Sequence, residues 1–309
     1  MGREFVIGTR DSALALWQTH WVHAELEKLF PEDTFSILHM KTQGDIILDV
    51  ALAKIGDKGL FTKELEVAML EKKIDFAVHS MKDLPTKLPD GLKLGAILER
   101  VEPCDVLISN KGYTLDTLPQ GAKVGTSSLR RRAQLLKCRP DIDIHDLRGN
   151  LNTRIKKLET EAFDAIVLAY AGVLRLGWED KITQRIPYTL SLPAVGQGSI
   201  GIEIRENDPE VEAVVAKLHH LKSAYAILAE RSLLRTLEGG CQIPIGALGD
   251  VQGDKITLHG LVGSLDGKEV LRSEVSGSVS EVEELGIKLA KQLIDMGADR
   301  ILADVRSAL

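Results

Sequence analysis

Ser199-Ile200-Gly201-Ile202-Glu203-Ile204 is the segment that decides the fold of this chain. Its alternating apolar residues are typical of a β-strand, yet no further strand-and-helix unit follows it. Two such units precede it, one ending near Arg100-Val101-Glu102-Pro103 and the other near Leu190-Ser191-Leu192-Pro193. Because the segment has no new sheet to start, we expect it to return to the first one. Two crossings would make a two-lobed hinge protein with a cleft between the lobes.

The remaining pattern predicts an α/β protein with a smaller domain at its end. Strand-like and helix-like runs alternate up to about residue 220, as in mostly parallel sheets covered by helices. A helix from Ala224 to Leu237 then precedes three strand-like runs and a last helix from about Ser280 to Met296. We therefore expect domain 1 at residues 1–99 and 199–217, domain 2 at 104–192, and a small α+β domain 3 at 221–309.

Length and composition restrict the class of function. A chain of 309 residues exceeds what one core usually supports. The net charge of −6 and the 4% aromatic content argue against a nucleic-acid partner. We find no signal-peptide pattern, no membrane-spanning run, and three cysteines that fit neither a disulfide framework nor a metal site. We therefore expect a cytoplasmic protein without bound metal or membrane partner, and the lack of interface stripes favours a monomer.

Cys241 lies in Leu237-Glu238-Gly239-Gly240-Cys241-Gln242-Ile243-Pro244. The glycine pair and the proline exclude a regular helix or central strand there, so the thiol lies on a tight loop. A free cysteine is most often a small buried apolar residue. A core cysteine rarely needs paired glycines beside it, so the sequence leaves a buried and a functional thiol both open.

Arginine residues follow four of the predicted strands. In an open α/β sheet the carboxyl ends of the strands line the ligand crevice. In Gly125 to Arg132, small and hydroxyl residues precede a helix whose unpaired N–H groups suit an anion. Arginine in a first helical turn opposes the helix dipole, so a ligand explains it better than helix stability does. A solvated basic face is the alternative, although lysine would serve that face equally well. The residues concerned are Arg10, Arg130, Arg131, Arg148, Arg154 and Arg175.

Asp83 is the acid that we expect in the same crevice, because His79-Ser80-Met81-Lys82-Asp83 follows a buried strand. The alternative is a turn-capping role, and we interpret the neighbouring His79 as a core group rather than a base. Lys54-Ile55-Gly56-Asp57-Lys58-Gly59 is a basic loop that either closes over an anion or is a simple turn. Gly196 to Gly201 fits a dinucleotide-binding string, but it leads into a strand instead of a helix, which favours a hinge.

Together these segments resemble the porphobilinogen deaminase family, also called hydroxymethylbilane synthases. The resemblance covers nearly the whole chain. It is carried by Arg10 to Ala15, Lys54 to Gly59, His79 to Asp83, Gly125 to Arg131, Leu147 to Asn150, Leu192 to Gly198 and Leu237 to Gly246. It implies a transferase that joins four porphobilinogen molecules head to tail, releasing ammonia, to give hydroxymethylbilane for porphyrin and haem biosynthesis. It also implies two periplasmic-binding-protein-like lobes and a third domain that carries the cofactor cysteine.

The resemblance assigns roles to individual residues. It implies a dipyrromethane cofactor held as a thioether on Cys241, and we expect Asp83 to be the main catalytic group because a carboxylate stabilises cationic pyrrole intermediates. The other implied cofactor-binding residues are Lys82, Thr126, Ser127, Ser128, Arg130, Arg131, Arg148 and Gly149. The implied substrate-binding residues are Arg10, Ser12, Gln18, Lys54, Lys58, Arg148, Arg154 and Arg175. Arg132 and Tyr170 receive no role.

Two other functions stay open on the sequence. A two-lobed anion receptor without chemistry offers no reason for the Cys241 loop. A thiol enzyme with a transient acyl group on Cys241 lacks a recognisable base and needs no set of arginines. The mass of the denatured chain separates the three, through a stable adduct of two pyrroles, an unmodified chain or a labile acyl group.

Overall fold

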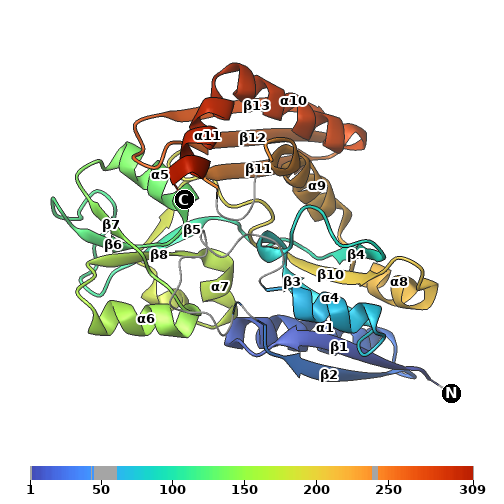
Figure 1. Cartoon of the computed structure of the whole chain (residues 1–309). Helices are drawn as coiled ribbons and strands as arrows, with labels where there is room; N and C mark the ends of the chain where they lie inside the picture. Colours follow the sequence, from blue (N-terminus) through green and yellow to red (C-terminus); the bar gives the residue numbers. More distant parts are fainter. Residues whose placement is uncertain (1, 43, 45–60, 239–242, 309) are drawn as a thin grey trace.

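The computed structural model describes residues 2–42, 44, 61–238 and 243–308. Figure 1 shows three bodies, with domain 3 (orange to red) above two α/β lobes. We call the lobe that contains the N-terminus lobe 1 and the lobe drawn mainly in green lobe 2. In the described ranges no helix is long and apolar enough to cross a membrane.

Lobe 1 is built on a five-stranded sheet of order β2-β1-β3-β10-β4. Its strands are β1 (Glu4–Arg10), β2 (Thr34–Met40), β3 (Phe76–Ser80), β4 (Leu92–Ile97) and β10 (Ile200–Arg205). β1 pairs in parallel with β2 and β3, whereas β10 runs antiparallel to β3 and β4. Because β10 follows lobe 2 in the sequence, the chain crosses between the lobes twice.

Two helices of lobe 1, α1 and α8, begin at a side chain that caps them. α1 starts after Ser12, whose hydroxyl accepts a hydrogen bond from the amide of Ala15. α8 starts after Asp208 with proline at its first turn. The helices are α1 (Ala13–Leu29), α4 (Lys63–Leu70), η1 (Met81–Asp83), α8 (Pro209–Val215) and η3 (Ala216–Leu218).

Lobe 2 repeats the design with the strand order β7-β6-β8-β5-β9. Its elements are β5 (Asp105–Ile108), β6 (Lys123–Gly125), α5 (Leu129–Cys138), β7 (Asp143–His145), α6 (Leu151–Thr160), β8 (Ala165–Ala169), α7 (Tyr170–Arg175), η2 (Glu179–Lys181) and β9 (Gln184–Ile186). β6 is parallel to β7 and β8, and β5 is antiparallel to β8 and β9. The expectation of mostly parallel sheets is confirmed for strand direction, because in each lobe all strands of the sheet except one run the same way. Both sheets are mixed, because the strand that follows each crossing, β5 or β10, enters in the opposite direction.

Domain 3 packs helices on one face of an antiparallel sheet of order β11-β12-β13. Its elements are α9 (Leu221–Thr236), β11 (Ile245–Gln252), β12 (Lys255–Gly263), β13 (Val270–Ser278), η4 (Val279–Glu281), α10 (Val282–Asp295) and α11 (Ala298–Ala308). A Cβ on Gly286 of α10 would lie 2.5 Å from Cβ of Ser232 on α9, so glycine permits this close helix contact. The prediction of a single last helix is wrong, because α11 follows Gly297, whose φ of +102° ends α10.

Glu230 joins domain 3 to the hinge. This fully buried carboxylate on α9 pairs with Arg100 at 2.5 Å and accepts hydrogen bonds from the amides of Gly196 and Gly249, both at 2.8 Å. Nε of Arg100 donates to the carbonyl of Gln197 at 2.8 Å. The pair of Glu230 and Arg100 therefore holds the two segments that connect the lobes, at Arg100 and at Gly196–Gln197, against Gly249 of β11. The residue limits given above for the three domains stay a prediction.

Candidate active site

Asp83 lies at the end of a short 3-10 helix that follows β3. Met81, the first residue of this η1 helix, is buried, and its amide donates to the carbonyl of Ser199 at 3.0 Å. A Cβ on Gly196 would lie 2.9 Å from Cβ of Met81, and its φ of +72° also favours glycine. This close approach holds η1 against the segment that leads from lobe 2 back to β10. It agrees with the interpretation of Gly196 as part of a hinge turn.

A small pocket of about 50 Å³ adjoins Asp83. Its wall includes Arg10, Ser12 and Gln18, which the resemblance gives as substrate ligands. The guanidinium of Arg10 lies over the ring of Phe61, 4.4 Å from its centre. The structure thus brings these three predicted side chains together with Asp83 at the ends of β1 and β3.

The amide of Gln18 is already engaged. Its nitrogen donates to the hydroxyl of Ser80 at 2.8 Å, so the side chain is held between α1 and β3.

Arg130 and Arg131 meet at one buried carboxylate in lobe 2. Asp105 is fully buried, and Nη1 of Arg130 and Nη2 of Arg131 each lie 2.7 Å from its oxygens. These two guanidinium groups outweigh the effect of burial and hold the pKa of Asp105 well below its usual range. Arg131 also donates to the carbonyl of Val167 at 2.9 Å. Both arginines are therefore partly occupied by protein groups.

The hydroxyl residues before α5 have structural partners. The hydroxyl of Ser128 caps α5 by accepting from the amide of Arg131 at 3.4 Å, and that of Ser127 accepts from the amide of Leu147 at 2.9 Å. The hydroxyl of buried Thr126 accepts from the amide of Ser128 at 3.2 Å. This arrangement brings the two βα loops of lobe 2 together.

The second of these loops contains Arg148, Gly149 and Arg154. Gly149 has a φ of +108°, and Nε of Arg154 donates to its carbonyl at 2.8 Å. Desolvation lowers the pKa of Arg154 to about 10, assisted by Arg131 and Arg148 and opposed by Asp83. The half-buried Arg148 therefore acts on the same guanidinium, that of Arg154, as Arg131 and Asp83 do.

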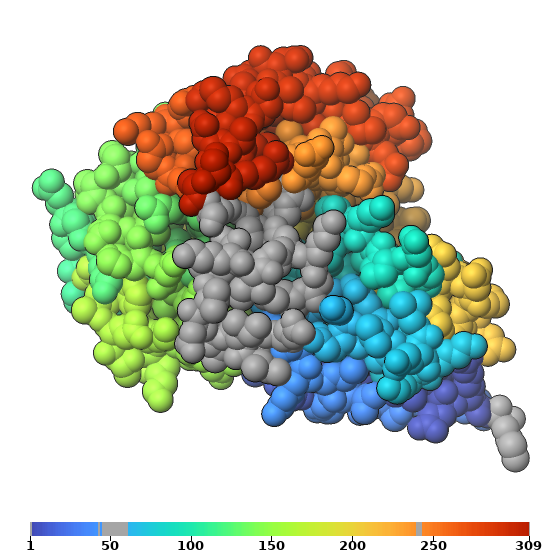
Figure 2. Space-filling view, viewed as in Figure 1, coloured from blue at the N-terminus to red at the C-terminus, as the bar shows by residue number. Residues whose placement is uncertain are grey.

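Lys82 interacts electrostatically with residues of both lobes. Desolvation lowers its pKa to about 8, Asp83 opposes the shift, and Arg131 and Arg154 of lobe 2 contribute to it. Figure 2 shows lobe 1 and lobe 2 on either side of the molecule beneath domain 3. The Lys82–Asp83 pair of lobe 1 therefore faces the arginines of lobe 2.

Arg175 lies where the lobes touch. It is buried on α7, donates to the hinge carbonyl of Gly198 at 2.9 Å, and lies 5.7 Å from the ring centre of Trp17 on α1. Desolvation lowers its pKa to about 10. Three predicted residues, Cys241, Lys54 and Lys58, lie outside the described residues.

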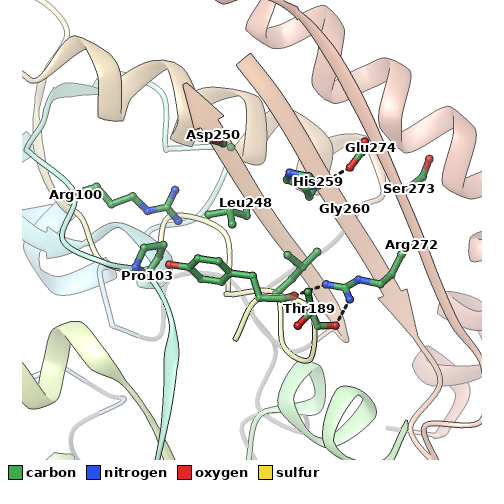
Figure 3. A pocket seen from close by; sticks show the side chains of 13 residues that line it. Arg100, Pro103, Thr189, Leu248, Asp250, His259, Gly260, Arg272, Ser273 and Glu274 are labelled. Atoms are coloured by element: carbon green, nitrogen blue, oxygen red, sulfur yellow. Dashed lines mark hydrogen bonds and ion pairs between the residues drawn. The ribbon is translucent and has the colours of Figure 1, made fainter. Parts of the chain in front are cut away.

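A larger cavity of about 780 Å³ lies away from this site, between the hinge and the sheet of domain 3. Figure 3 shows Arg272 directed at the carbonyl of Thr189, and His259 beside Glu274. None of the described residues predicted for cofactor or substrate lines this cavity. Across residues 2–42, 44, 61–238 and 243–308, no group of three His, Cys, Asp or Glu side chains is placed to hold a metal ion.

The sequence analysis missed two buried acids of this region, Asp105 and Glu203. Each lies in a strand among apolar residues, in Asp105-Val106-Leu107-Ile108 and in Ile202-Glu203-Ile204. A charged residue inside a buried strand is costly unless it is paired, and that signal could have identified both.

Two solved binding proteins are among the structural matches. The chain aligns with a probable amino-acid ABC transporter extracellular-binding protein from Bacillus subtilis at 14% identity and a TM-score of 0.43, covering 71% of this chain and 90% of that one. It aligns with the aliphatic sulphonate binding protein SsuA from Escherichia coli at 16% identity and a TM-score of 0.41, covering 76% and 70%. The description of the fold rests on the topology above, not on these matches.

Sequence relatives cover the chain from end to end. A porphobilinogen deaminase from Carboxydothermus hydrogenoformans is 58% identical over 306 residues, which are 99% of this chain and 98% of the relative. One from Synechococcus elongatus is 54% identical over 306 residues, or 98% and 96%.

Two family models match successive parts of the chain. The model "Porphobilinogen deaminase, dipyromethane cofactor binding domain" matches residues 5–213, and "Porphobilinogen deaminase, C-terminal domain" matches residues 224–295. Relatives and models agree with the resemblance found in the sequence. The chain therefore belongs to the porphobilinogen deaminase family and polymerises porphobilinogen to hydroxymethylbilane with a dipyrromethane cofactor.

Proposed function

We propose that the chemistry takes place between the lobes, with Asp83 as the main catalytic group and the cofactor held as a thioether on Cys241. The observation that carries this assignment is the convergence of groups from both lobes. Lys82 of lobe 1 interacts electrostatically with Arg131 and Arg154 of lobe 2, and Asp83 interacts with Arg154.

The charges of this region fit a polycarboxylate ligand. Each pyrrole of a dipyrromethane carries an acetate and a propionate, so the cofactor brings several anionic groups. The lowered pKa values of Arg154 and Arg175 follow chiefly from desolvation, and no ion pair within 4.0 Å is found for either residue in the described part of the chain. A bound carboxylate would supply the missing counter-charge in a bidentate geometry that guanidinium groups favour.

The remaining proposed ligands surround these groups. Cofactor contacts are proposed for Lys82, Thr126, Ser127, Ser128, Arg130, Arg131, Arg148 and Gly149. Substrate contacts are proposed for Arg10, Ser12, Gln18, Lys54, Lys58, Arg148, Arg154 and Arg175. Because Arg130 and Arg131 share Asp105, their remaining N–H groups would bind the ligand while Asp105 fixes their orientation.

Asp83 supplies the one kind of charge that the basic residues cannot. When bound, the cofactor supplies the pyrrole end to which substrate units are added. A carboxylate within hydrogen-bond reach of a pyrrole N–H stabilises positive charge on the ring and accepts the N–H hydrogen bond. The position of Asp83 beside the pocket of Arg10 and Gln18 supports this role. We also propose that the protein is a cytoplasmic monomer and that it has no nucleic-acid or membrane partner.

Intact mass of the denatured protein tests the tether. The parent chain is expected to carry a stable adduct of two pyrrole units on the peptide that contains Cys241. Cys241→Ser is expected to fold and to lack the adduct, whereas Cys104→Ser and Cys138→Ser keep it. An adduct that persists in Cys241→Ser would refute the assignment.

A further inference from the structure

His79 and Glu203 form a buried pair behind the pocket of Asp83. Nε2 of His79 lies 3.0 Å from Oε2 of Glu203, with 5% and 0% of the two residues exposed. The residues are diagonal neighbours on one face of the lobe 1 sheet, because Gly201 pairs with His79 and Glu203 with Ala77. The pair is therefore fixed by two strands and not by a loop.

The carboxylate of Glu203 is only partly satisfied. Its second oxygen, Oε1, is buried and has no hydrogen-bond partner in the described structure, and the same holds for Oε1 of Glu66 on α4. Burial raises the pKa of Glu66, and the neighbouring Glu203 raises it further. The two buried carboxyl groups and the imidazole of His79 therefore form one cluster.

A purely structural role explains this arrangement poorly. A buried ion pair is often no more stabilising than apolar residues of similar volume, and an unsatisfied carboxylate oxygen adds a cost. His79 also lines the pocket that Asp83 lines. With Nε2–H donated to Glu203, Nδ1 is the nitrogen that can accept a proton, and in the described structure no hydrogen bond engages it.

We propose that His79, oriented by Glu203, is a second proton-transfer residue of the polymerisation and removes the proton that the pyrrole carbon loses after each C–C bond forms. This inference rests on the assignment of the Asp83 pocket as the reacting site. His79 is buried and paired, as expected of a core group, and the proposal adds a chemical role to it.

The step balances without any oxidant or reductant. The C–N bond of the substrate's aminomethyl group breaks, and its nitrogen, which enters as ammonium, leaves as ammonia. A C–C bond forms between that methylene carbon and the free α-carbon of the terminal pyrrole. The proton on this α-carbon passes to Nδ1 of His79, the ring electron pair restores aromaticity, and the imidazolium is stabilised by Glu203. The proton then passes to the released ammonia or to water.

The charged groups that face His79 are Glu203 on β10, Glu66 on α4, and Asp83 and Arg10 in the wall of the pocket. Because an imidazole must be neutral to accept a proton, kcat should fall under acidic conditions.

His79→Gln tests the proposal, because the amide can still donate to Glu203 but cannot take up the proton. We expect kcat to fall on the order of 10²-fold with little change in KM. Porphobilinogen deuterated at its free α-carbon should show a larger isotope effect on kcat in this variant than in the parent, and the acidic limb of the pH profile should be lost. The matched control is His259→Gln, which removes a histidine paired with Glu274 at 2.9 Å outside the site. This control should keep the parent kcat.

Two further measurements keep the test decisive if His79→Gln does not fold. Glu203→Gln should show the same isotope effect, because the neutral partner no longer stabilises the imidazolium. NMR of the parent with labelled imidazole should place the proton of His79 on Nε2. An isotope effect equal to the parent's in both variants, or a proton on Nδ1, would overturn the proposal. An Asp83→Asn chain with the parent rate would instead overturn the assignment of the pocket.

Discussion

Replacing Asp105 by Asn is expected to destabilise lobe 2 strongly without changing the volume of the side chain. The carboxylate accepts hydrogen bonds from both guanidinium groups, from the hydroxyl of Ser191 at 3.2 Å and from the amide of Gln197 at 3.0 Å. The amide keeps one acceptor oxygen and turns an NH2 group toward the guanidinium groups. Arg130 and Arg131, which are 4% and 5% exposed, then lose their common counter-charge.

Breaking a buried ion pair by removing one partner costs about 3–5 kcal/mol. We therefore expect the free energy of unfolding to fall by about that amount. The pH dependence follows from the lowered pKa of Asp105. A depressed carboxyl pKa adds stability above the unfolded-state value of about 3.9, and this stability is lost as the pH falls toward the folded-state value. The parent should therefore lose lobe 2 stability under acidic conditions more steeply than the variant does.

Urea unfolding followed by circular dichroism, with hydrogen exchange of the β5 and β8 peptides, measures this effect. The comparison is made in a Cys241→Ser background, so that a tethered cofactor does not contribute to stability. The control is Asp143→Asn, which removes an exposed pair with His145 at 2.6 Å and should change stability by less than about 0.5 kcal/mol. A loss below about 1 kcal/mol for Asp105→Asn would refute the reasoning.

Three other changes test the site and its scaffold. Asp83→Ala should lower kcat on the order of 10²-fold or more in a steady-state assay, and a parent rate would contradict its catalytic role. In the parent, KM should rise as the pH increases above about 8, because Lys82 loses the charge that holds the cofactor carboxylates in the position to which substrate binds. Lys82→Arg should lack this rise, and an identical pH profile would count against the idea. Gly149→Ala places Cβ 2.6 Å from Cγ2 of Thr153 at a φ of +108°, so urea unfolding should show a loss of about 1–3 kcal/mol. Gly177→Ala, with a φ of +70° and open space around Cβ, should lose less, and equal losses would exclude the contact as the cause.

The local part of the fold could be predicted from the sequence. Periodicity and capping chemistry act over a few residues, as where Asn150 caps α6 (Leu151–Thr160) and Ser12 caps α1. The strands β4 and β9 were not predicted. Both complete sheets through partners that are distant in sequence, such as Arg205 for Leu92 of β4.

The site was predictable only in its residue types. A run of arginines indicates an anion, but it does not say whether a guanidinium faces a ligand or a protein carboxylate. Arg130 and Asp105 are 25 positions apart, and His79 and Glu203 are 124 positions apart. These pairings follow from the sheet topology, so the sequence alone did not identify Asp105 and Glu203 as the partners.

The position of β10 has a consequence for synthesis on the ribosome. β10 lies between β3 and β4, so lobe 1 cannot complete its sheet until residue 205 has left the exit tunnel. Lobe 2 is continuous from β5 to β9 and can fold earlier. Until then β3 and β4 expose unpaired edges, the kind of surface that nascent chains shield by chaperone binding. Lobe 2, although it is translated after most of lobe 1, is thus expected to reach its native form first.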